Sequence, residues 1–230
     1  MTGAADPVTG GRAAGPGMFG LFFFLTLFLQ KIMGFSPLRA GVAFQPMTIT
    51  LFAVSRLAPR LMPRLGAKPL MIAGMVPAIG SMAWLSRVTP ATGYWSGIFG
   101  PMLLIGLGVG LVLVPLTAAS LAGVPAEDSG VASGLVNMVQ PVGGALGLGV
   151  LVAVYGTAAR QAASHPVAGL TLAAQAQHVI THGIAAGFAV AAILDVCSLL
   201  VVIAFIKSRR SAPAPAAARA REGAVAEAPG

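Results

Sequence analysis

The chain has 230 residues, of which 57% are hydrophobic and only 9% are charged, and its mean hydropathy is +0.87. An ordinary soluble domain carries about 25% charged residues, so this composition excludes a soluble globular protein, and a disordered chain needs the opposite bias. The formal net charge of +8 is spread thinly and lies partly beside apolar runs, which favours cationic loops flanking a membrane over a nucleic-acid site.

Six apolar runs are long enough to cross a bilayer core, which takes about 20 helical residues. They are too long for buried strands and lack the short alternating segments of a membrane barrel, so we predict an all-α membrane protein. The predicted spans, in chain order, are 14–33, 38–58, 69–86, 97–122, 130–156 and 183–206. They form one bundle over 18–206. We expect a flexible leader over 1–17, an extracytoplasmic loop over 157–182 and a disordered cytoplasmic tail over 207–230.

Lysine and arginine are distributed unevenly between the two sides of the predicted bundle. With six spans both termini lie on one side, which holds ten of these residues against four on the other. Because cytoplasmic loops carry the excess of Lys and Arg, we predict that both termini are cytoplasmic. The connection from Arg60 to Lys68 is then a short basic cytoplasmic loop.

Glycines recur four residues apart in the fourth and fifth spans. This spacing lets helix backbones approach closely. It is read either as tight packing within one bundle or as a surface on which helices slide between two states. The predicted packing glycines are Gly106 and Gly110 in the fourth span, and Gly130, Gly134, Gly143 and Gly147 in the fifth.

Polar side chains inside the spans predict a shared cavity. Such groups are costly in lipid and face a partner helix or a water-filled space. Any single one of them is explained by hydrogen bonds between helices, but four different spans each carry a polar face, which favours a cavity. The residues predicted to line it are Gln30, Gln45, Thr48, Asn137 and Gln140.

Asp195 is the only acid deep inside a predicted span. An acid at that depth is a candidate for proton coupling, and the alternative is a neutral or paired group that anchors the last helix. The single cysteine excludes a disulfide within the chain and any Cys-based metal site. The three histidines have no Cys or acid close by in sequence, so we predict no metal site. No catalytic motif is present, and we predict that the chain is not an enzyme.

Two acids, Glu127 and Asp128, precede the fifth span. They are explained equally well in two ways. One is capping and dipole stabilisation of the following helix. The other is an ionic latch to Arg64 or Lys68 on the same cytoplasmic face. In the second interpretation the basic residues from Arg60 onward and the two acids form a cytoplasmic gate.

Several short motifs occur in an order that resembles one known family. They are Phe24–Gln30 (FLTLFLQ), Gly34–Gly41 (GFSPLRAG), Phe44–Pro46 (FQP), Pro63–Gly66 (PRLG) followed by Lys68, Gly123–Asn137 (GVPAEDSGVASGLVN) and Gly143–Gly147 (GGALG). Over roughly 18–206 they resemble the C-terminal half of the fourteen-helix drug/proton antiporters of the major facilitator superfamily. Two departures fall on the predicted cavity, because the family tends to have an apolar residue at Gln45 and Arg-Gln at Gln140-Pro141.

The resemblance implies proton-driven export of small, amphipathic, drug-like molecules by alternating access of two six-helix bundles in the cell membrane. It implies no cofactor, a proton gradient as driving force, the lipid bilayer as surroundings and a missing N-terminal helical half as partner. It also implies that the last span, with Asp195, is peripheral. Two alternatives remain. One is export of a metabolite or endogenous antibiotic. The other is a non-transporting membrane module, or a truncated gene product, that packs against a separate partner half.

Overall fold

The computed structural model describes residues 15–121 and 129–205, and every regular element in these ranges is helical. The N-terminal rod consists of α2 (Gly15–Leu27) and η1 (Phe28–Ile32), a short π-helix that continues it. The following helices are α3 (Pro37–Ala43), α4 (Gln45–Leu65), α5 (Ala67–Leu85), η2 (Tyr94–Ile98), α6 (Phe99–Leu121), α7 (Ser129–Ser164) and α8 (Leu172–Phe205).

The helix ends follow from local chemistry. Ser36 caps α3, accepting a hydrogen bond of 3.3 Å from the backbone N–H of Arg39, and Pro37 occupies the first helical position, where its missing N–H costs nothing. Gly66 is the only residue between α4 and α5. Its φ of +83° lies in a region that residues with a Cβ rarely adopt, so this tight connection needs glycine.

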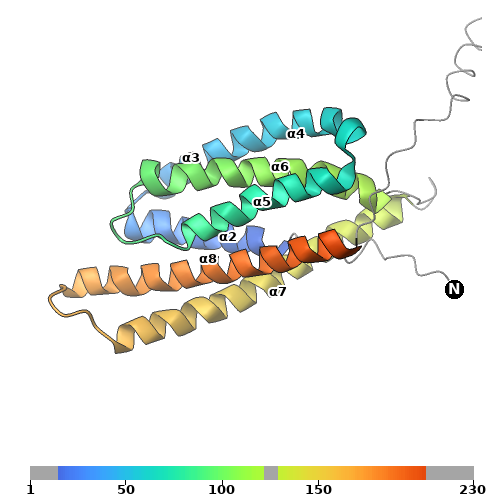
Figure 1. Cartoon of the computed structure of the whole chain (residues 1–230). Helices are drawn as coiled ribbons and strands as arrows, with labels where there is room; N and C mark the ends of the chain where they lie inside the picture. The colour runs from blue at the N-terminus through green and yellow to red at the C-terminus, as the bar shows by residue number, and fades with distance from the viewer. Residues whose placement is uncertain (1–14, 122–128, 206–230) are drawn as a thin grey trace, which may run out of the picture.

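If η1 is counted with α2, α3 with α4 and η2 with α6, the described residues make six helical rods. These rods form two groups of three (Figure 1). In one group, α6 packs between α4 and α5. In the other, α7 packs against α8, and α2 packs against both. The groups join chiefly where α5 meets α8. This arrangement leaves one long side of α4 and one of α7 without a partner helix in the described structure.

The main core is built around α2. Leu21, Phe24, Leu25, Phe28 and Leu29 are all buried, and side chains from α5, α6, α7 and α8 complete the cluster. The Phe24 ring meets Phe188 of α8 edge-on at 5.9 Å between centroids. The outward faces of the helices stay apolar as well, with exposed residues such as Ile193 and Leu200 on α8. Lipid, not water, suits such a surface.

Several helices run farther than the sequence predicts. The predicted basic loop from Arg60 to Lys68 is wrong, because α4 continues to Leu65 and α5 begins at Ala67. The predicted loop over 157–182 shrinks to 165–171, because α7 ends at Ser164 and α8 begins at Leu172. The stretches added to α7 and α8 are rich in alanine, the strongest helix former, and helices can continue beyond the hydrocarbon layer. The stretch added to α4 has no alanine and contains Pro59 and Pro63, so helix propensity does not explain its length.

Four helices within the described residues are long and apolar enough to cross a membrane: Ala67–Leu85, Tyr94–Leu113, Pro141–Ser164 and Leu172–Ala204. Met18–Ile32 is a shorter apolar helix. The sequence predicted six spans. The helix that falls short of the prediction most clearly is α4, because Arg56, Arg60 and Arg64 lie along its second half and lower its hydropathy.

Candidate functional site

Three of the predicted cavity residues lie near the two short connections that join η1 to α3 and α3 to α4. Gln30 is half-buried in η1, and Gln45 is the exposed first residue of α4. Thr48 lies one turn later and is half-buried, and its hydroxyl donates to the Phe44 carbonyl at 3.4 Å. Gln45 is therefore a polar group on a helix face that no described helix covers.

The other two predicted cavity residues, Asn137 and Gln140, lie on α7, and their side chains are outside the described part of the structure. The same helix carries a stripe of four exposed apolar residues. They are spaced four residues apart, so they share one helix face. These are Met138 (72% exposed), Val142 (61%), Leu146 (69%) and Val150 (53%). The stripe was not predicted, although its spacing is visible in the sequence.

The basic residues of the predicted gate lie at one end of the bundle. Arg60 and Arg64 are exposed on the last turns of α4. Lys68 reaches across to α8, where its Nζ donates to the Ile203 carbonyl at 2.7 Å. Ile203 lies in the last described turn of α8, and a cation beside the carbonyl end of a helix is favourable. Glu127 and Asp128 lie outside the described residues, and the latch stays a prediction.

The glycines of α6 alternate between two neighbours. A Cβ added to Gly106 would meet the Met47 carbonyl, and one added to Gly110 would meet Val54, so both face α4. Gly108 faces the other way. A Cβ there would lie 2.6 Å from the Gly74 carbonyl, and one on Gly74 would lie 2.7 Å from the Gly108 carbonyl. The sequence analysis singled out the first two and missed the pair between α5 and α6.

The predicted packing glycines of α7 are not equivalent. Gly147 is buried and Gly143 half-buried. No described atom lies within 4 Å of a Cβ built on Gly134, so the described residues make no close helix contact there. The surroundings of Gly130 are outside the described part of the structure. The close approach of α7 to α2 instead occurs at Gly144, where a Cβ would overlap the Phe19 ring.

Asp195 lies half-buried on α8, on the same helix face as the buried Ala191 and Val202. This helix packs against α2, α5 and α7 and not against α4. The structure therefore does not bring Asp195 together with Gln45 and Thr48.

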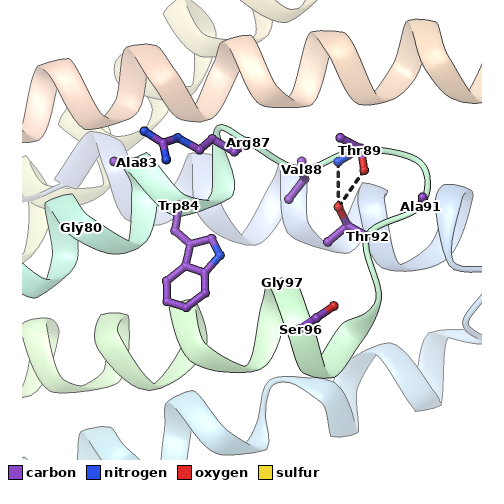
Figure 2. A pocket seen from close by; sticks show the side chains of 10 residues that line it. All are labelled: Gly80, Ala83, Trp84, Arg87, Val88, Thr89, Ala91, Thr92, Ser96 and Gly97. Carbon is purple, nitrogen blue, oxygen red and sulfur yellow. Dashed lines mark hydrogen bonds between the residues drawn. The ribbon is translucent and has the colours of Figure 1, made fainter.

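A cavity of about 600 Å³ lies where α5 turns into η2 and α6 (Figure 2). The Trp84 ring lies between α5 and α6, and the Thr89 and Thr92 hydroxyls are 3.1 Å apart across the turn. The lining residues are Gly80, Ala83, Trp84, Arg87, Val88, Thr89, Ala91, Thr92, Ser96 and Gly97. None of the predicted cavity residues lines this space, which sequence reasoning did not find.

Aromatic and basic side chains gather at this end of the bundle. The Tyr94 hydroxyl donates to the Ala43 carbonyl at 2.7 Å, which ties η2 to the break between α3 and α4. The Trp95 ring lies 5.4 Å from that of Tyr94, and the Arg39 guanidinium lies 4.1 Å from the Phe35 ring centre. Tyr, Trp and basic residues at helix ends are typical of a membrane–water interface.

Comparison with protein families assigns this helical bundle. The family profile of the Major Facilitator Superfamily matches residues 8–148. The chain belongs to the Major Facilitator Superfamily. The match covers α2 to α6 and the first part of α7, and α8 lies beyond it. Membership in this superfamily of membrane transporters confirms that the apolar helices are those of a membrane protein.

The similar curated proteins are named for export and resistance. The chain is 42% identical over 147 residues to the cephamycin export protein CmcT of Amycolatopsis lactamdurans, which is 63% of this chain and 30% of that protein. It is 40% identical over 138 residues to the puromycin resistance protein pur8 of Streptomyces alboniger, covering 59% and 27%. It is 33% identical over 138 residues to the multidrug transporter protein MdtP of Bacillus subtilis, covering 60% and 25%.

The chain is much shorter than these superfamily members. A matched stretch of 147 residues that makes up 30% of CmcT implies a length of about 490 residues, roughly twice the 230 residues here. The six helical rods of the structure are consistent with half of a superfamily transporter.

Proposed function

We propose that this chain is the C-terminal six-helix half of a proton-coupled exporter of small, amphipathic, drug-like molecules. Its superfamily membership and the export and resistance names of its relatives support export. Its length and its bundle of six helical rods support a half transporter. In such a protein two bundles enclose the substrate path, and alternating access moves one against the other.

One observation carries the proposal: the exposed side of α4 begins with a polar group. Gln45 is exposed, and on the following turns of α4 Ile49 is 65% exposed and Phe52 is 66% exposed. An exposed amide facing lipid is costly, whereas an amide beside apolar side chains suits a pocket for amphipathic molecules. We therefore assign this face of α4, with Gln30 and Thr48 nearby in the chain and Asn137 and Gln140 of α7, to the substrate path and to the contact with the N-terminal half.

The bundle's orientation follows from its ends. Lys31, Arg39, Arg87 and Arg160 lie at helix ends on one side, together with the aromatic residues around Tyr94. Arg60, Arg64 and Lys68 lie on the opposite side. We infer that the second side is cytoplasmic, that both termini lie there, and that the protein resides in the cell membrane.

The driving force in this proposal is the proton gradient, with no cofactor. Asp195 is the acid that this half offers for a proton site, although its place on α8 keeps it from the exposed face of α4. The basic residues Arg60, Arg64 and Lys68, with Glu127 and Asp128, would stabilise one end state at the cytoplasmic side. The second candidate is a membrane module that packs against a separate partner half and transports nothing.

The test is a chimera in which this chain replaces the corresponding part of CmcT in a host sensitive to cephamycin and puromycin. We expect the chimera to lower accumulation of the drug and to lose this effect when the proton gradient is collapsed. Gln45→Leu should reduce export several-fold at unchanged expression. Gln161→Leu, an exposed glutamine at the far end of α7, is the matched control and should change nothing.

The outcomes separate the candidates. Export that is unchanged by Gln45→Leu would remove this residue from the substrate path. A chimera that is inserted at the level of CmcT but leaves accumulation of both drugs unchanged would contradict the export proposal and favour the non-transporting module.

A further inference from the structure

The three histidines of the chain gather around the hairpin between α7 and α8. His165 follows the end of α7, whereas His178 and His182 lie one turn apart near the start of α8. The rings of His178 and His182 are stacked, with centroids 6.2 Å apart and planes inclined by 29°. Sequence analysis predicted no metal site here because no acid or cysteine is near, but it did not weigh the pairing of two imidazoles.

We propose that His178 and His182 bind a divalent transition metal ion of borderline softness, Cu²⁺, Ni²⁺ or Zn²⁺. Imidazole nitrogen suits these ions, and residues four apart on a helix present their side chains on one face. Two imidazoles that share a metal at about 2.0–2.1 Å from each nitrogen need ring centres about 5 Å apart. The observed spacing requires about 1 Å of closing, which rotation of the exposed His182 side chain supplies.

The nitrogen atoms of His178 are differently placed. Its Nδ1 is buried and has no hydrogen-bond partner, whereas its Nε2 is not enclosed in this way. Metal binding through Nε2 makes Nδ1 a donor, and ligating histidines usually donate from that second nitrogen to a nearby acceptor. Thr181, three residues on along the same face, has a buried hydroxyl that also lacks a partner. A proton held on Nδ1 by metal binding at Nε2 would need an acceptor, and the Thr181 hydroxyl is a candidate on the same helix face.

We place the pair outside the hydrocarbon layer, where a hydrated ion can reach it, because α8 is longer than a span needs. The apolar part of α8 from Ile184 to Ala204 is 21 residues, about 31 Å, and by itself fills a bilayer core of about 30 Å. His178 and His182 precede this stretch, and Figure 1 shows the α7–α8 hairpin projecting beyond the other helices at that end. Since no group of three potential metal ligands occurs among the described residues, water completes the coordination sphere.

The experiment titrates Cu²⁺ and Ni²⁺ into the full chain, purified in detergent with an affinity tag other than polyhistidine. Cys197 is exposed and thiolate is a copper ligand, so all variants are made in a Cys197→Ser background. We expect one Cu²⁺ per chain, nitrogen couplings in its electron paramagnetic resonance spectrum, and a rise in the unfolding temperature on adding metal.

The matched variants are His182→Gln and His165→Gln. Both remove one exposed imidazole from the same hairpin, but only the first breaks the pair. We expect His182→Gln to weaken Cu²⁺ binding at least tenfold and to abolish the metal-induced shift in unfolding temperature, whereas His165→Gln leaves both unchanged. Equal effects of the two variants, binding that survives His182→Gln, or no binding at millimolar Cu²⁺ would each overturn the proposal.

Discussion

Replacing Gly108 by alanine tests the close approach of α5 and α6. The added Cβ would lie 2.6 Å from the Gly74 carbonyl and 2.9 Å from the Ala78 Cβ, where ordinary contact begins at 3.4 Å. The axes of α5 and α6 would have to separate locally by about 0.8 Å, or the backbone would have to bend. Overpacking of this kind costs about 1–3 kcal/mol.

Gly80→Ala on α5 is the matched control, because Gly80 is exposed and no described atom lies within 4 Å of a Cβ built there. Both variants gain about 1 kcal/mol of helix propensity, so the difference between them isolates the packing term. For a chain of this size, 1–3 kcal/mol corresponds to roughly 2–12 °C in unfolding temperature. Circular dichroism of the detergent-solubilised protein measures it. If Gly108→Ala unfolds at the same temperature as Gly80→Ala, the close approach of α5 and α6 is wrong.

Three further variants test individual hydrogen bonds by the same melts. Ser81→Ala removes the donor to the Pro101 carbonyl, a buried bond of 2.8 Å between α5 and α6, and should cost about 0.5–1.5 kcal/mol; an unchanged melting temperature would show that the bond contributes nothing. Tyr94→Phe removes the half-buried bond to Ala43 and should cost about as much, with faster proteolysis near η2 as a second measurement. Lys68→Met keeps the apolar part of the side chain but loses the exposed hydrogen bond to the Ile203 carbonyl. Solvent screens a charge at an exposed site, so we expect the free energy of unfolding to fall by less than about 1 kcal/mol, and a larger fall would contradict this reasoning.

The existence of the helices was predictable, because length and apolarity alone require them in lipid. Their ends were not. The sequence analysis treated the polar stretch after 156 as a loop, although alanine there favours helix once the chain has left the hydrocarbon layer. Arg60 and Arg64 likewise read as a loop, yet they are the exposed side of the last turns of α4.

The site was only partly predictable, because residue spacing gives a helix face but not the helix that it meets. Gly106 and Gly110, four residues apart, both face α4, while Gly108, two residues from each, faces α5. The cavity around Trp84 depends on how η2 folds back on α5, which no local pattern specifies. The spacing of His178 and His182 was visible, but their stacking required the folded side chains.

The single-residue connection at Gly66 constrains how this half of the protein can move. With one residue between them, α4 and α5 share a pivot whose only soft torsions are those of Gly66 and its immediate neighbours. Because α6 packs closely against α4 at Gly106 and Gly110 and against α5 at Gly108, we expect the three helices to move as one unit. We therefore expect a tilt of α4 to move the face of α5 that packs against α8 as well.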